Sequence, residues 1–175
     1  IVGARSLVAI FKAYDVRGIV PDDLDVDAAR RIGSAFATWS RAPRIAIGRD
    51  CRLSSPDLAA ALAEGIAGTG ADVVDLGLAS TDLVYFAAGS LDVPAIMLTA
   101  SHNPPMWNGM KFCLGGARPV GEETGLAAIR ELAEADAAPR GPARGRVEAR
   151  DLLDAYVDHR SEEHTSELQS RFGIS

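Results

Sequence analysis

Short apolar runs alternate with segments of helical periodicity along most of this chain. The apolar runs predict strands over residues 44–48, 71–77, 94–98 and 110–114. Apolar side chains at helical spacing predict helices over 25–38, 57–67, 81–88 and 122–135. Strands that alternate with helices favour a mostly parallel sheet with helices on both faces. We therefore expect the α/β class, as a three-layer α/β/α domain with a mostly parallel, mixed sheet.

Local signals refine this fold prediction. A serine N-cap at Ser54-Ser55 with Pro56 in the first turn is a typical helix start. The dipeptide Asn108-Gly109 is a turn signal, so residues 110–114 should return antiparallel to 94–98. In the first predicted helix, the face expected to point inward holds Val26, Ala29, Ile32, Gly33 and Phe36.

The composition excludes several classes of protein. The chain has 175 residues and is 47% hydrophobic, which is enough for one ordinary core. A net charge of -6 argues against a nucleic-acid partner, because such proteins need clustered Lys and Arg. Two cysteines suggest no disulfide framework, and no apolar run approaches the roughly 20 residues that span a bilayer. We expect a cytoplasmic protein without a membrane or nucleic-acid partner.

The C-terminal part of the chain differs in character from the rest. Residues 139–145 (PRGPARG) have the composition of a linker, and a new helix is expected over 151–158 with nothing after it to pack against. The string RSEEHTSELQS has no apolar period and resembles a translated sequencing-adapter oligonucleotide. We therefore expect one domain over residues 1–140, a linker and the start of a truncated second domain over 141–159, and a non-native tail over 160–175.

A cluster of polar residues follows the third predicted strand, in the stretch LTASHNPPMWNGMKF. It brings together Ser101, His102, Asn103 and Lys111 around two prolines. Ligands of an open parallel sheet gather at the carboxyl ends of its strands, and Ser101 lies just past such an end. Three chemistries could use this loop: acyl transfer, nucleotide binding and phosphoryl transfer.

The residues argue against the first two chemistries. Ser101 and His102 are adjacent, so their side chains point apart in an extended chain, and there is no G-x-S-x-G elbow. The chain also has neither a G-x-G-x-x-G nor a G-x-x-x-x-G-K-[ST] motif. Phosphoryl transfer through a phosphorylated serine needs an exposed hydroxyl, nearby cations and usually a metal ion. A phosphoserine carries about -1.5 to -2 charges, and Lys111 and Arg17 are the kind of residues that it requires.

Three spaced motifs give this chain a resemblance to a known family. TASHNPPMWNGMK (residues 99–111) resembles the phosphoserine loop of the alpha-D-phosphohexomutases. FKAYDVRG (11–18) resembles the N-terminal signature of these enzymes, and GRDCRLSSP (48–56) resembles the loop after their second strand. GLASTDLVYFA and GGARPVGEETGL look like the bacterial phosphomannomutase/phosphoglucomutase branch, so the resemblance covers residues 10–158.

The resemblance implies roles for individual residues. Ser101 would carry the phosphate, which would be one ligand of Mg²⁺, the implied cofactor. His102 and Asn103 would shape the loop and contact phosphate or substrate. Lys111 and Arg17 would supply positive charge near proton transfer to the sugar hydroxyls. Tyr14 would line the same cleft.

The implied reaction is an intramolecular phosphate shift between the 1- and 6-positions of a hexose phosphate, through a phosphoserine enzyme and a bisphosphate intermediate. The family spreads this machinery over four domains, of which this chain resembles the first. Domains II–IV would be its partners in the same chain, and the fragment alone would be inactive. Trp107 departs from the family pattern by adding bulk before Asn108-Gly109. Arg49 and Asp50 have a simpler structural interpretation, holding the strand-to-helix turn.

Two alternatives stay open. One is a sugar-phosphate binding module that uses the same cleft without catalysis. The other is an inactive structural domain with a vestigial motif. The preferred hexose, whether mannose, glucose or glucosamine phosphate, is not fixed by these residues.

Overall fold

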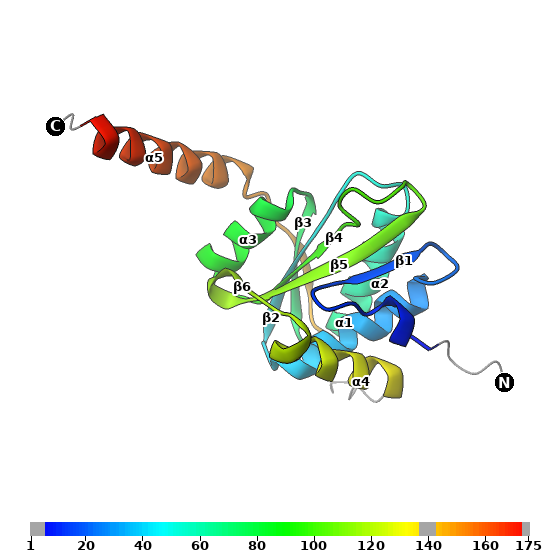
Figure 1. Cartoon of the computed structure of the whole chain (residues 1–175). Helices are drawn as coiled ribbons and strands as arrows, with labels where there is room; N and C mark the ends of the chain where they lie inside the picture. The colour runs from blue at the N-terminus through cyan, green and yellow to red at the C-terminus, as the bar shows by residue number, and fades with distance from the viewer. Residues whose placement is uncertain (1–5, 137–142, 173–175) are drawn as a thin grey trace.

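A computed structural model of the chain describes residues 6–136 and 143–172, with side chains described as far as residue 162. At its centre is one sheet in the order β1-β5-β4-β2-β3-β7, with β6 paired to β5 (Figure 1). Strand β4 is parallel to β2, β2 to β3, and β3 to β7, whereas β5 is antiparallel to β1, β4 and β6. The mixed sheet is therefore confirmed, as is the antiparallel pairing of 94–98 with 110–114. The strands are β1 (Val16–Ile19), β2 (Arg44–Arg49), β3 (Asp72–Leu78), β4 (Ala95–Leu98), β5 (Trp107–Leu114), β6 (Arg118–Pro119) and β7 (Val147–Ala149).

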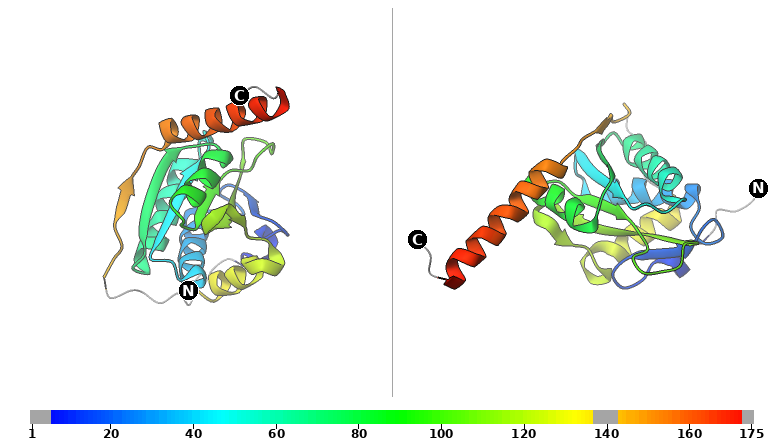
Figure 2. Two further views of the ribbon diagram at one scale, coloured as in Figure 1. Left: turned by 90° about the vertical axis from the view of Figure 1, so that its left-hand side faces the viewer. Right: turned by 90° about the horizontal axis from the view of Figure 1, so that it is seen from above.

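Helices cover both faces of this sheet, as expected (Figure 2). One core, which includes Phe36 and Phe112, contains residues of α1, α2 and α4; the other contains residues of α3. The α-helices are α1 (Val26–Ser40), α2 (Ser55–Gly68), α3 (Thr81–Ser90), α4 (Ala127–Ala135) and α5 (Leu153–Phe172). Short helical turns are η1 (Val8–Ile10), η2 (Gly115–Ala117) and the wide turn η3 (Glu122–Leu126).

Each central strand supplies side chains to both cores in alternation. In β2, Ile45 and Ile47 face the helices α1 and α2, while Ala46 faces the core of α3. In β3, Val73 faces α1 and α2, while Val74 faces the core of α3. Because both faces are buried, the apolar residues of these strands are consecutive rather than alternating, as in residues 45–47 of β2 and 73–74 of β3, although Asp75 interrupts β3.

Two glycines let α1 and α2 pack backbone against backbone. A Cβ on Gly33 would lie 2.4 Å from the carbonyl oxygen of Leu62, and one on Gly65 would lie 2.0 Å from that of Arg30. Real Cβ atoms do not approach this closely. Both positions therefore exclude every larger residue unless the two helices move apart.

The prediction of a turn at Asn108-Gly109 is wrong. Both residues lie inside β5, where Asn108 pairs with Gly18 and Gly109 with Arg17 of β1. A Cβ on Gly109 would lie 2.2 Å from the carbonyl oxygen of Val16, so glycine is needed here for close approach of the two strands. The chain reverses earlier, between β4 and β5. Strand pairing has overridden the local turn preference.

Other differences concern the element ends. Val26 was expected to point inward but is 46% exposed, whereas Ile32 and Phe36 are fully buried as predicted. The predicted helix 122–135 is divided, because η3 precedes α4 and Gly125 has a φ of 150°. This positive φ breaks the helical backbone, and the ring of Trp39 occupies the space that a side chain at Gly125 would need, so glycine is required there.

Three short strands were not predicted from the sequence, namely β1, β6 and β7. Strand β7 lies within residues 141–159, which were expected to hold a linker and the start of a second domain, and it pairs with β3 through Val73 opposite Val147. Residues 139–142 of the stretch with linker composition are outside the described residues. A strand of three residues has too little sequence pattern to recognise, and its partner strand defines it.

The last helix, α5, extends away from the sheet (Figures 1 and 2). It begins near the expected 151–158, and its first turns contact α3: the ring of Tyr156 lies 5.6 Å and that of His159 5.1 Å from the ring of Phe86. The helix continues to Phe172, while residues 160–162 are exposed. Most of residues 160–175 lie beyond the described side chains, so their interpretation as a non-native tail stays a prediction. Among the described helices, none combines the length and the apolar character that a membrane crossing requires.

Candidate active site

The loop between β4 and β5 begins at the carboxyl end of the buried strand β4. Strand β2 runs parallel beside β4, so the loop after β2 lies at the same edge of the sheet. Ser101 follows Leu98 closely, and its side chain is exposed. The sequence prediction placed Ser101 at this edge, and the structure agrees.

Ser101 has an unusual backbone conformation. Its φ is 54°, in the left-handed region that few non-glycine residues adopt. Its N–H donates to the hydroxyl oxygen of Thr99 at 3.0 Å, and the N–H of Asn103 donates to the Ala100 carbonyl at 3.0 Å. A residue held in a sparsely populated conformation costs about 1–3 kcal/mol, so surrounding contacts must offset this strain.

A buried carboxylate gathers the two predicted cations. Asp15 is 6% exposed and accepts from Arg17, whose Nη2 is 2.7 Å away, and from Lys111, whose Nζ is 3.4 Å away. The Nη1 of Arg17 also donates to the side-chain oxygen of Asn103 at 3.0 Å. The pairing of β1 with β5 thus joins Arg17 and Lys111 to the loop that carries Ser101. Asp15 and Arg17 thus form an ion pair in which the carboxylate is buried and the arginine is partly exposed.

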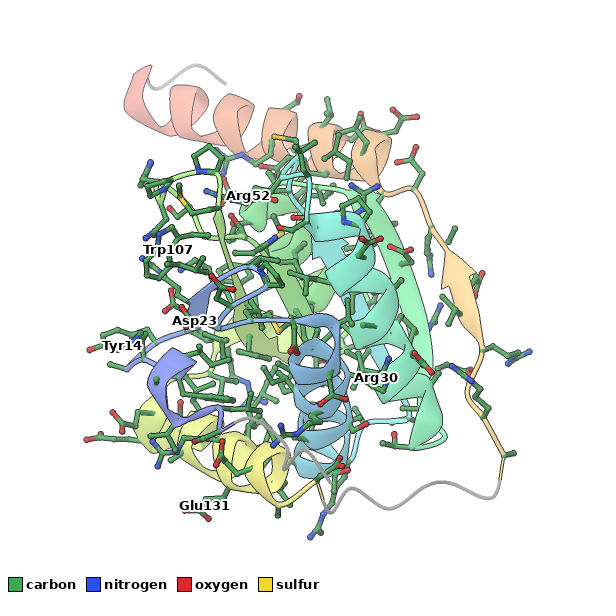
Figure 3. All side chains as sticks on the ribbon, turned by 90° about the vertical axis from the view of Figure 1, so that its right-hand side faces the viewer. Tyr14, Asp23, Arg30, Arg52, Trp107 and Glu131 are labelled. Carbon is green, nitrogen blue, oxygen red and sulfur yellow. The ribbon has the colours of Figure 1, made fainter. Side chains whose placement is uncertain are left out.

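Arg52 is the residue that sequence reasoning missed. Its guanidinium is the centre of a cradle of four backbone carbonyl groups, those of Ser101, Asn103, Pro104 and Trp107, at 2.8–3.0 Å. Its Nε donates to Asp50 at 3.0 Å. Figure 3 shows Arg52 and Trp107 toward the same end of the sheet. The GRDCRLSSP motif was the available signal, but it does not reveal which atoms an arginine contacts.

A second network holds the strand-to-helix turn after β2. The carboxylate of Asp50 accepts from the Ser55 hydroxyl at 2.6 Å, and the buried amide of Asn108 donates to the hydroxyl oxygens of Ser54 and Ser55 at 2.9 and 3.0 Å. Asp50 therefore has the structural role expected of it. Ser54 occupies the N-cap position without capping through its side chain, since its hydroxyl accepts from Asn108 instead.

The remaining candidates lie at the periphery. His102 is exposed beside Ser101, and Tyr14 is 80% exposed and projects from the surface (Figure 3). Trp107 is half-buried. Within the described part of the chain, no three His, Cys, Asp or Glu side chains gather in a way that could hold a metal ion. These residues therefore do not by themselves fit a complete Mg²⁺ site.

Comparison with known proteins identifies the family of this chain. The model of the phosphoglucomutase/phosphomannomutase alpha/beta/alpha domain I matches residues 8–140. The chain belongs to the phosphoglucomutase/phosphomannomutase family. A phosphomannomutase of Escherichia coli K12 is 45% identical over 152 residues, which are 85% of this chain and 33% of that protein. Phosphohexose mutases of Xanthomonas campestris are 45% identical over 150 residues, 85% of this chain and 34% of theirs.

Two further relatives of the family differ in how much of them is matched. A Klebsiella pneumoniae sequence called phosphomannomutase is 44% identical over 151 residues, which are 96% of it. The crystal structure of a phosphoglucomutase/phosphomannomutase family protein from Burkholderia thailandensis superposes with a TM-score of 0.77 at 38% identity, over 86% of this chain and 34% of that one. The chain thus spans about a third of the length of most of these relatives.

Proposed function

We propose that this chain is the phosphoserine-bearing domain of a phosphohexomutase, an isomerase that interconverts hexose 1-phosphate and 6-phosphate by intramolecular phosphotransfer. The observation that carries the proposal is the exposed Ser101 at the carboxyl edge of the sheet, in a loop joined to Arg17 through Asn103. Membership of the mutase family supports it.

The proposed chemistry uses the Ser101 side-chain oxygen as the resting place of the phosphoryl group. In the forward half-reaction, the bond from phosphorus to the serine oxygen breaks and a bond to a sugar hydroxyl oxygen forms. The proton of that hydroxyl leaves, and the serine oxygen regains a proton. The bisphosphate then turns, and its other phosphoryl group returns to Ser101 by the same exchange in reverse.

The residues around Ser101 would act by position and charge. Arg17 and Lys111 balance only one carboxylate, Asp15, and so leave net positive charge beside the loop. Such charge stabilises a phosphoserine and the charge that develops during transfer. His102, Asn103 and Tyr14 are proposed to contact the phosphate or substrate from the exposed side.

Two parts of the proposal lie outside this chain. Mg²⁺ would balance the charge on the phosphoryl oxygens, with the Ser101 phosphate as the ligand from this chain and the other ligands from elsewhere in the protein. We propose that domains II–IV, which would follow in the same protein, also supply sugar selection, and that the chain alone is inactive. A cytoplasmic location stays a prediction.

A chimaera tests the function. Residues 8–140 would replace the matching segment of the Escherichia coli phosphomannomutase, with Ser101→Ala as the test and Ser90→Ala, an exposed serine of α3, as the matched control. We expect Ser101→Ala to remove nearly all turnover and the single phosphate seen by intact-mass spectrometry, with an unchanged melting midpoint. Turnover within about tenfold of the parent, a loss of no more than about 1.4 kcal/mol, would contradict the phosphoserine assignment. Retained sugar-phosphate binding without turnover in the parent chimaera would favour the binding module.

A further inference from the structure

We propose that Arg52 is a positioning residue for phosphoryl transfer, because its guanidinium holds the loop of residues 101–107 in the shape that presents the Ser101 hydroxyl. This inference rests on the proposed function. It concerns a side chain that approaches Ser101 only through backbone atoms, and so acts through the loop rather than on the substrate.

The cradle matches the donors of an arginine. A guanidinium has five N–H groups in a fixed planar fork. In this structure, Nη1 donates to the carbonyls of Pro104 and Trp107, and Nη2 donates to those of Ser101 and Asn103. The fifth donor, Nε, is bound to Asp50. The Arg52 side chain is 11% exposed, so solvent can replace few of these bonds.

These contacts fix Ser101 from both sides. The N–H of Ser101 is held by Thr99, and its carbonyl oxygen is held by Arg52 at 2.9 Å. With both peptide groups oriented, the left-handed φ of 54° is the conformation that satisfies them. The direction of the serine side chain follows from this backbone conformation. The prolines cannot do the same, since they fix φ only at positions 104 and 105, after Ser101.

Removing the arginine would take a donor away from four carbonyl oxygens that point at one place, of which only that of Pro104 has another described donor, the Trp107 N–H at 3.0 Å. Carbonyl dipoles aligned in this way repel each other, so the loop would open. The positive charge of Arg52 is balanced by the carboxylate of Asp50, whose oxygen lies 3.0 Å from Nε. The effect of this charge is therefore distinct from the effect of the hydrogen bonds to the loop. Lysine keeps the charge but has only three donors on one atom, so it cannot satisfy the five acceptors. Arg52→Lys therefore separates loop geometry from charge.

The first experiment uses the 175-residue chain itself. Hydrogen–deuterium exchange would compare wild type, Arg52→Lys and the control Arg30→Lys. Arg30 pairs with Glu64 and Asp27 and lies away from the loop, as Figure 3 shows. We expect Arg52→Lys to speed exchange only in peptides that cover residues 99–108. Unchanged exchange in the loop, or faster exchange throughout the sheet with a lower melting midpoint, would overturn the positioning role.

The second experiment measures catalysis in the full-length chimaera. A displacement of the reacting group by about 1 Å can lower turnover by about 100-fold. We expect Arg52→Lys to lower kcat by about that factor while KM stays unchanged, and Arg30→Lys to match the parent. Arg52→Ala should recover part of its kcat when guanidinium ion is added. A kcat equal to that of the parent, or a change confined to KM, would overturn the inference.

The outcomes distinguish the two proposals. If Ser101→Ala abolishes turnover and Arg52→Lys does not change it, the inference fails and the proposed function stands. If Ser101→Ala remains active, the proposed function fails, and with it the catalytic role of Arg52, whatever the exchange experiment shows about the loop.

Discussion

The two cysteines of this chain occupy opposite environments. Cys51 is exposed next to Arg52, whereas Cys113 is buried in β5 with its thiol near the carbonyl of Ala95. Burial raises the pKa of the Cys113 thiol from 9.0 to about 11. Since the thiolate is the reactive form, Cys113 is protected both by its position and by its protonation state.

We therefore expect a thiol reagent to modify one cysteine in the native protein and both in denaturant. The measurement is the absorbance released by Ellman's reagent at mildly alkaline pH, with Cys51→Ser as the control that removes the fast reaction. Fast reaction of two thiols in the native wild-type protein would contradict the buried position of Cys113.

At the scale of single residues, the sequence predicted those whose chemistry is local and missed those whose role depends on geometry. Ser101, Arg17 and Lys111 became candidates because their motifs are distinctive, and their roles stay predictions. Arg52 was missed because its partners are backbone carbonyls, which every residue has. Asp15 was not a candidate because only the pairing of β1 with β5 brings both Arg17 and Lys111 to its carboxylate.

The contact between α1 and α2 gives a test at the scale of elements. Gly65→Ala would place a methyl group 2.0 Å from the Arg30 carbonyl, whereas a Cβ on Gly68, in the same helix, would meet nothing within 4 Å. Overpacking of this kind costs about 1–3 kcal/mol or more. We expect Gly65→Ala to lower the free energy of unfolding by about 1–3 kcal/mol or more. Urea denaturation measures this difference.

Gly68→Ala is the matched control. It should be neutral or stabilise the helix by up to about 1 kcal/mol, because alanine is the better helix former. Equal effects of the two substitutions would show that α1 and α2 do not cross at Gly65.

A helix or strand could be predicted when the contacts that stabilise it leave a pattern in its own sequence. The strands β2, β3 and β4 were found because both of their faces are buried, so consecutive apolar residues mark each of them, even though Asp75 interrupts β3. Strands β1 and β7 were missed because each is a short edge strand defined by its neighbour. The false turn at Asn108-Gly109 has the same origin, since the partner strand β1 decides the conformation there.

At the scale of the whole molecule, the two C-terminal segments should contribute unequally to stability. A variant that ends at His159 loses only residues whose described members are exposed, so its melting midpoint should equal that of the full chain. A variant that ends at residue 142 also loses β7, which pairs with β3. Losing these few hydrogen bonds, at about 1 kcal/mol each, should lower the midpoint by several degrees.

Differential scanning calorimetry of the two variants and the full chain provides the measurement. A lower midpoint for the variant that ends at His159 would show that residues 160–175 pack against the domain, contrary to their interpretation as a non-native tail.

The wide separation of the site residues along the chain has a consequence for biosynthesis. Arg17 reaches Asn103 across 86 positions, and Lys111 reaches Asp15 across 96. A ribosome that adds about 5–20 residues per second makes β1 roughly 5 to 20 seconds before β5 exists to receive it. During that interval, Arg17 and Asp15 lack the partners Asn103 and Lys111, which have not yet been synthesised. A nascent chain interrupted before residue 111 can form helices and even a partial sheet, but not the arrangement of charges around Ser101.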